Sequence, residues 1–191
     1  MKTKTLLVLI FAVLACMQWF VPAQMIFEKE KILAQGKEFK FKTAPVDPSD
    51  PFRGKFITLS FEANWLEIGN DSDYYANEPV FVTLTSDDNG FARIASISKE
   101  PPGDDPDYVK ALVQYVSRVN ENKVYIEYPF TRFYMDELKS GSAENVYRRS
   151  LRDTSSTTYA LVSVREGNAV LKDVMIDGVS IREIAQRSKE N

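Results

Sequence analysis

The sequence predicts a β-rich α+β fold: an antiparallel meander forming a curved sheet or partly open barrel with one packed helix, preceded by a single N-terminal transmembrane helix. Three observations predict this class. An uncharged apolar run covers Leu6–Phe27. A series of short segments then alternates between apolar and polar residues, with turn residues between them. After these opening residues, one clear helical segment, Ala143–Arg152, interrupts the alternating pattern.

The apolar run is long enough to be a membrane anchor. At about 1.5 Å per residue, the 22 residues of Leu6–Phe27 cross the roughly 30 Å hydrocarbon layer as a helix. A cleavable signal ends its apolar core after about 7–15 residues, and this run continues well past that length. We therefore expect an uncleaved anchor in the bilayer. The alternative is a lipoprotein signal, because Val13-Leu14-Ala15-Cys16 loosely resembles a lipobox with Cys16 as the acylated residue.

The expected location is the inner (cytoplasmic) membrane, with the soluble domain in the periplasm. Lys2 and Lys4 precede the span, and a short basic segment before the first apolar run is typical of an exported chain. Five lysines between positions 29 and 42 oppose this orientation, but acidic residues are interleaved among them. The predicted division is residues 1–36 for the anchor with its helical extension, and 37–191 for the extracytoplasmic β-rich domain.

Period-two alternation locates the strands in order. The helix is expected to end at Gly36, and the next segment, Lys37–Thr43, places Phe39 and Phe41 on one face and lysines on the other. The further predicted strands are Phe56–Phe61, Val80–Thr85, Phe91–Ser98, Tyr108–Ser117, Lys123–Tyr128, Thr157–Arg165 and Ala169–Asp177.

Turns and the helix complete the predicted elements. Hairpin turns are expected at Asp88–Gly90, Asn120–Asn122 and Glu166–Asn168, because Gly, Asn and Asp accept turn conformations. Leu66–Glu78, rich in Asn, Asp and Ser, is predicted to be a long surface loop. The helix Ala143–Arg152 is capped by Ser142, and its expected packing face consists of Val146, Tyr147 and Leu151.

Composition disfavours several classes of function. After position 27 the chain has 22 basic and 27 acidic residues, a net charge of −5, so it lacks the positive field that nucleic acid requires. The chain has no histidine, the usual general base and the commonest transition-metal ligand. Its single cysteine, Cys16, lies in the apolar run and cannot build a zinc site in the folded part. We expect no cofactor and no nucleic-acid partner, and an enzyme is the less favoured class.

Two acidic clusters do not predict a metal site. Asp71-Ser72-Asp73 and Asp104–Asp107 carry carboxylates, but they lack the spacing and the closing glutamate of an EF-hand loop. We therefore predict neither metal ligands nor catalytic residues.

The leading interaction site is the proline-rich junction before the second strand. Prolines exclude regular structure there and fix the backbone on both sides of Asp50, so that less entropy is lost on binding. The candidate partner-binding residues are Asp47, Asp50, Arg53 and Lys55. The alternative is a series of Asx-turns with Arg53 paired locally.

A candidate polar pocket consists of Arg132, Tyr134, Asp136 and Glu137. Tyrosine and glutamate are competent acid and base groups once buried. The alternative is a solvated link between a strand and the following helix.

The best enzyme hypothesis is a membrane-anchored hydrolase that uses a Ser-Lys pair or a carboxylate site. A Ser-Lys arrangement requires no histidine, and Ser60 with Lys55 would be the pair. Ser60 alternates with Leu59, however, and is expected on the solvated face of an ordinary strand.

The eight residues from Gly54 to Phe61 resemble the signature of the GDYXXLXY family, membrane-anchored bacterial proteins of uncharacterised function. Gly54 and Leu59 match, Phe56 and Phe61 replace the two tyrosines, and Lys55 replaces the acidic residue. The resemblance implies a single-pass, extracytoplasmic β-rich domain beside a membrane or periplasmic protein. A charge-based role does not carry over to Lys55. The expected function is therefore a membrane-tethered envelope binding or accessory domain.

Overall fold

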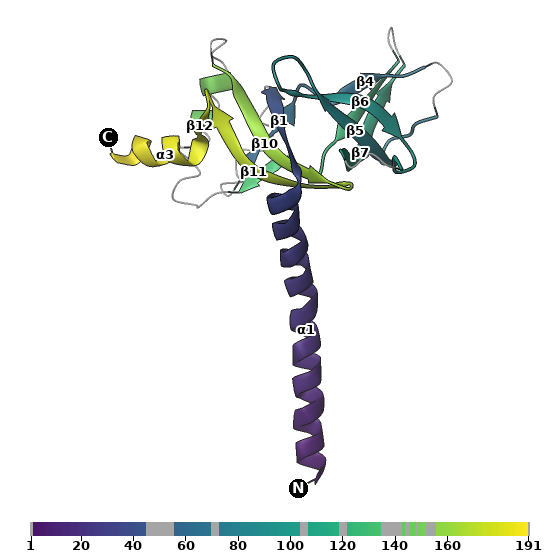
Figure 1. The fold of residues 1–191 in the computed structure, drawn as a ribbon, viewed down its shortest axis with the longest axis vertical. Helices are drawn as coiled ribbons and strands as arrows, with labels where there is room; N and C mark the ends of the chain where they lie inside the picture. Colours follow the sequence, from purple (N-terminus) through teal and green to yellow (C-terminus); the bar gives the residue numbers. More distant parts are fainter. Residues whose placement is uncertain are drawn as a thin grey trace.

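The computed structural model shows a β-rich body with one long helix extending away from it (Figure 1). The described residues are 2–44, 56–69, 73–103, 107–118, 122–134, 143, 146–147, 149–151 and 156–190. The four candidate partner-binding residues of the proline-rich junction, Asp47, Asp50, Arg53 and Lys55, lie outside them, as does most of the predicted turn Asn120–Asn122.

Helix α1 (Lys2–Gln35) contains the predicted span and its extension. No residue of its apolar stretch is buried, and the mean hydropathy there is 2.3, so α1 is long and apolar enough to cross a membrane. The span Leu6–Phe27 is about 33 Å long, and Glu28–Gln35 adds a stalk of about 12 Å. As predicted, the helix ends before Gly36, whose amide donates to the carbonyl of Ile32 (2.8 Å).

The eight predicted strands are all present, and Phe56–Phe61 is divided into two. The strands are β1 (Lys37–Ala44), β2 (Phe56–Thr58), β3 (Ser60–Phe61), β4 (Trp65–Glu67), β5 (Pro79–Ser86), β6 (Ala92–Ser98), β7 (Tyr108–Ser117), β8 (Lys123–Glu127), β9 (Arg132–Tyr134), β10 (Thr158–Arg165), β11 (Asn168–Ile176) and β12 (Val179–Ser180). Strands β4, β9 and β12 are not predicted, because two or three residues are too few to show alternation. Strand β4 begins just before the predicted loop Leu66–Glu78 and corrects the start of that loop.

The described strand pairs are antiparallel and form two five-stranded sheets, β12-β11-β10-β1-β3 and β4-β8-β7-β5-β6, with β2 paired to β9. In the second sheet the two edge strands, β4 and β6, come close together, so the sheet curls into a nearly closed barrel (Figure 1). The bridges Lys40–Phe91 and Val109–Gly167 connect the two sheets. The predicted β-rich class is confirmed, although β1 lies between β10 and β3, and β5 between β6 and β7, which departs from a simple meander.

Aromatic side chains fill the centre of the core. Phe39 and Phe41 are buried on the inner face of β1, as their alternation predicts. The ring of Phe41 packs against those of Phe61, Tyr128 and Phe130, with centroids 5.1–5.3 Å apart. Phe61 therefore has a structural role.

Two helical segments pack on this body. In the first, Val146, Tyr147 and Leu151 are helical, Tyr147 is buried, and the other two contact the core, which confirms the predicted packing face. The second, α3 (Ile181–Glu190), is an additional helix not predicted from the sequence.

The sequence does carry a signal for α3. Ser180 and Glu183 have the spacing of a capping box, and the Ser180 hydroxyl accepts a hydrogen bond from the amide of Arg182 (3.2 Å). Ile181 and Ala185 are fully buried on the face of α3 that packs on the body. This capping signal is difficult to recognise in the sequence, because residues 177–178 just before it are typical of a hairpin turn.

Helix α1 is joined closely to the first sheet. The Ser163 hydroxyl, fully buried on β10, donates to the carbonyl of Ile32 (2.6 Å). A Cβ at Gly36 would lie 2.4 Å from the Ser163 oxygen, so only glycine permits this approach. Arg165 hydrogen-bonds to Gln35 at the same level. The stalk and the sheet therefore form one connected unit.

Candidate functional site

A cleft of about 680 Å³ lies where β4 and β6, the edge strands of the barrel, face each other. We call it the β4–β6 cleft. Its lining residues are Lys42, Glu62, Ala63, Trp65, Leu66, Asp87, Asn89, Phe91, Ala92, Arg93, Ile94 and Thr157. Its volume is within the range of ligand-binding pockets, and its lining includes both polar and apolar side chains.

The hairpin between β5 and β6 forms one wall of the cleft. The Asp87 carboxylate accepts hydrogen bonds from the amides of Asn89 (2.9 Å) and Phe91 (2.8 Å), and Gly90 takes a positive φ of 78°. This is the turn predicted at Asp88–Gly90. Because the Phe91 ring also packs on Tyr159 of β10, the wall is fixed to the first sheet.

The segment from Glu62 to Leu66 forms the opposite wall. The Tyr128 hydroxyl donates to the carbonyl of Ala63 (2.7 Å), which holds this segment against the core. Trp65 lies opposite Tyr125 of β8 and is 40% exposed, and the Lys123 ammonium is 4.1 Å from its ring centroid. A large aromatic side chain is thus held at the rim.

The charges in the cleft are incompletely matched. Lys42 and Glu62 form an ion pair (3.0 Å), but both side chains are about half exposed, so water screens their attraction. Arg93 is exposed and has no ion-pair partner among the described residues. The cleft therefore offers a guanidinium and a weakly held pair to an incoming ligand. Within the described part of the chain, no group of acidic or cysteine side chains could hold a metal ion.

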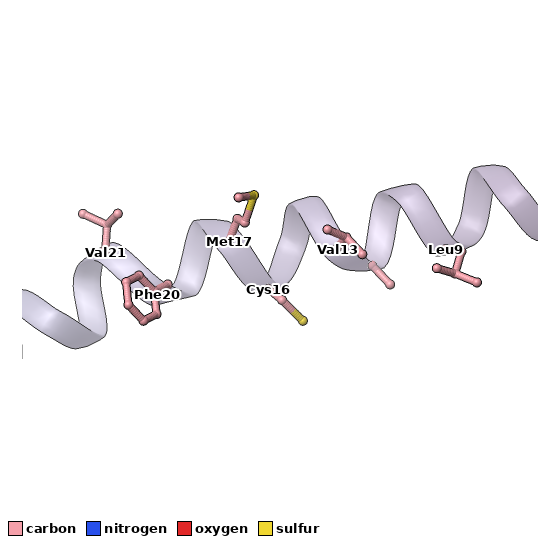
Figure 2. A pocket seen from close by; sticks show the side chains of 7 residues that line it. Leu9, Val13, Cys16, Met17, Phe20 and Val21 are labelled. Carbon is pink, nitrogen blue, oxygen red and sulfur yellow. The ribbon is translucent and has the colours of Figure 1, made fainter.

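A second concave surface runs along the apolar part of α1 past Cys16 (Figure 2). Its lining residues are Leu9, Ala12, Val13, Cys16, Met17, Phe20 and Val21, all from this one helix. When α1 spans a bilayer, lipid tails can cover such a groove. The β4–β6 cleft is therefore the stronger candidate.

The described members of the predicted polar pocket lie elsewhere. Arg132 and Tyr134 are both exposed on β9, where Tyr134 lies opposite Phe56 and Arg132 lies opposite Thr58 of β2. The Arg132 guanidinium is 5.2 Å and the Tyr134 ring 5.6 Å from the Phe56 ring centroid. Asp136 and Glu137 lie outside the described residues.

Ser60 lies on β3 between the buried residues Leu59 and Phe61, as its alternation predicts. It lines a separate pocket of about 260 Å³ beside Glu127. Lys55, its proposed partner, is outside the described residues, and none of the described residues lining this pocket is a lysine.

Sequence reasoning does not single out Trp65, Arg93, Lys42 or Glu62. The cleft brings together four segments that are far apart in the sequence, and the closeness of β4 to β6 is a consequence of barrel curvature. The turn at Asp88–Gly90 is the only local signal that could have pointed to it.

Comparison with known proteins gives one match. A family model described as GDYXXLXY protein matches residues 18–174, which include part of α1, the second sheet, the first sheet except β12 and the end of β11, and the whole β4–β6 cleft. No curated protein and no solved structure matches the chain.

Proposed function

This chain belongs to the GDYXXLXY protein family, and we propose that it is a membrane-tethered binding domain of the cell envelope. In this proposal the β4–β6 cleft holds an extended segment of a membrane or periplasmic partner protein. The observation that carries the proposal is the cleft itself, a ligand-sized hollow between two sheet edges.

The two edges favour a polypeptide ligand. Strands β4 and β6 are the terminal strands of their sheet, so each has an outer edge that pairs with no other strand of that sheet. Such edges recruit extended peptides by main-chain hydrogen bonding. Trp65 and Arg93 stand at the rim, and tryptophan and arginine are the residue types that most often dominate binding energy in protein interfaces.

The junction with α1 supports action beside a membrane. Because Ile32 and Gly36 are packed against Ser163, a domain anchored by α1 would keep its cleft at a set height above the bilayer. This geometry favours a partner whose binding segment lies near the same surface. On the basis of the short basic segment before the span, we propose that this is the periplasmic surface of the membrane.

Photo-crosslinking in native membranes tests the proposal. The photoreactive residue p-benzoylphenylalanine is introduced at Asn89 or Arg93, two exposed cleft positions, in the full-length chain. Both positions should give adducts with the same protein. Ala63→Phe, which fills the cleft from its wall, should reduce the yield at least about fivefold.

The matched control position is Glu183, an exposed residue of α3 that does not line the cleft. It should give no such adduct. The proposal is wrong if Asn89 and Arg93 give no discrete adduct, or if Glu183 captures the same protein with equal yield.

A further inference from the structure

Three aromatic side chains form a row across the outer face of the barrel. Trp65 of β4 lies opposite Tyr125 of β8, and Tyr125 lies opposite Tyr115 of β7. The two tyrosine rings stack, with centroids 4.2 Å apart and planes inclined by 15°. Trp65 and Tyr115 are 40% and 47% exposed. We call these three residues the aromatic row.

A small pocket of about 260 Å³ is lined in part by the direct chain neighbours of all three row residues, Asn64, Gln114 and Ile126. Its lining residues with polar groups are Thr58, Ser60, Asn64, Gln114, Glu127, Tyr128 and Thr131, and the other lining residues are Leu59, Phe61 and Ile126. Hydroxyl and amide groups both donate and accept hydrogen bonds, whereas the carboxylate accepts only. Among the described residues that line the pocket, none is basic.

Chain connectivity places the row and the pocket together. Asn64 directly precedes Trp65, and Gln114 directly precedes Tyr115 at an irregularity in the pairing of β7 with β8. Glu127 is two residues after Tyr125 on β8, and both side chains therefore lie on the same face of the strand. Each of the three strands thus supplies one aromatic residue and one polar pocket residue, directly or from its flank.

We propose that this surface binds a neutral glycan. One sugar unit occupies the pocket, and the following units lie along the aromatic row. This site goes beyond the proposed function and shares only Trp65 with the β4–β6 cleft.

The chemistry of the surface favours a sugar over other small ligands. Sugar hydroxyls are donors and acceptors at once and match amide, hydroxyl and carboxylate groups, while the apolar C–H faces of the rings match aromatic side chains. A phosphate or carboxylate group would meet Glu127 without a basic residue among the described pocket residues. The pocket is smaller than about 300 Å³, the lower limit for drug-sized ligands, which suits a single ring.

Rigidity of the row also favours binding. Tyrosine and tryptophan provide contact area at a low entropic cost, because each has only two side-chain torsions. The Lys123 ammonium above Trp65 and the stacking of Tyr115 on Tyr125 restrict these side chains further.

Fluorescence of Trp65 tests the proposal. The chain has two tryptophans, so Trp19→Phe leaves Trp65 as the only one. The full-length variant is held in a detergent without a sugar head group and titrated with chitotetraose and with cellotetraose, two neutral oligosaccharides. At least one should change the Trp65 emission saturably. Tyr115→Ala and Gln114→Ala should each weaken its binding at least about tenfold.

Tyr134→Ala is the matched control, because Tyr134 is also an exposed tyrosine but lies on β9, outside the barrel sheet. It should bind the sugar as the parent does. The proposal is overturned if neither oligosaccharide binds, if Tyr115→Ala binds unchanged, or if anionic polygalacturonate binds more tightly than both neutral probes. Crosslinking of a protein to Tyr115 without any sugar binding would also contradict it.

Discussion

Two buried tyrosines in this domain differ in how their hydroxyl groups are satisfied. Tyr128 and Tyr147 are 2% and 3% exposed, and burial raises the pKa of both phenols well above the usual value. The Tyr128 hydroxyl donates to the carbonyl of Ala63. The Tyr147 hydroxyl lies near Thr43 but makes no hydrogen bond in the described structure.

Removing these hydroxyl groups should therefore have unequal effects. Tyr128→Phe removes the part-buried hydrogen bond to the Ala63 carbonyl and should lower the free energy of unfolding by about 0.5–1.5 kcal/mol. Tyr147→Phe removes an unsatisfied group and should leave stability unchanged or raise it slightly. Urea denaturation of the two variants measures the difference, and equal losses would show that the hydrogen-bond assignment is wrong.

A surface pair should give a pH-dependent contribution to stability. Lys99 lies 2.8 Å from Glu78, and their hydrogen bond lowers the pKa of Glu78 and raises that of Lys99. Because the folded pKa of Glu78 is below its unfolded value of about 4.3, this stabilisation is present above about pH 4.3 and is lost as the pH falls through the folded pKa. Stabilisation through Lys99 is complete below about pH 10.4 and is lost as the pH rises through its folded pKa.

The prediction concerns Glu78→Gln. Between about pH 5 and 9 its melting temperature should be slightly below that of the parent, because a partly exposed pair contributes little. Below about pH 4 the two melting temperatures should converge. A difference that persists or grows in acid would exclude this pair as its cause.

Among the elements, the end of α1 depends on one glycine. A Cβ at Gly36 would lie 2.4 Å from the Ser163 oxygen and 2.5 Å from the carbonyl of Ile32. Gly36→Ala should therefore destabilise the domain by about 1–3 kcal/mol, as overpacking does. Gly103→Ala is the control, because nothing lies within 4 Å of a Cβ there. Similar unfolding free energies for the two variants would contradict a tightly packed junction.

Elements with a local signal are predictable from this sequence. Strand β1 alternates because Phe39 and Phe41 face the core, and α1 ends where Gly36 must approach Ser163. Strands β4 and β9 carry no such signal, because they are three residues long and exist through pairing with β8 and β2. The cleft is unpredictable for the same reason, since it depends on the approach of β4 to β6.

Helix α1 continues without interruption through Cys16, and we expect it to anchor the chain without acylation. The Cys16→Ser variant should therefore remain in the membrane fraction after a carbonate wash. Its amount there should equal that of the parent, and its mass should differ from the parent's only by the substitution. Release of this variant from the membrane would favour the lipoprotein alternative.

For the whole molecule, the orientation across the membrane follows from the proposal. Alkaline phosphatase fused after the last residue should be active, because it folds only when exported. A fusion at residue 5, before the span, should be inactive. The reverse pattern would move the β-rich domain to the cytoplasm and exclude a periplasmic partner.

Occupancy of the β4–β6 cleft in the membrane is the most direct measure of the proposed function. In a Cys16→Ser background, which removes the only cysteine, Arg93→Cys and Glu183→Cys are labelled with a maleimide in opened native membranes and after purification. We predict that Arg93→Cys reacts at least about tenfold more slowly in membranes than when purified, while Glu183→Cys reacts equally in both. Equal rates for Arg93→Cys in the two preparations would contradict a cleft filled by a partner.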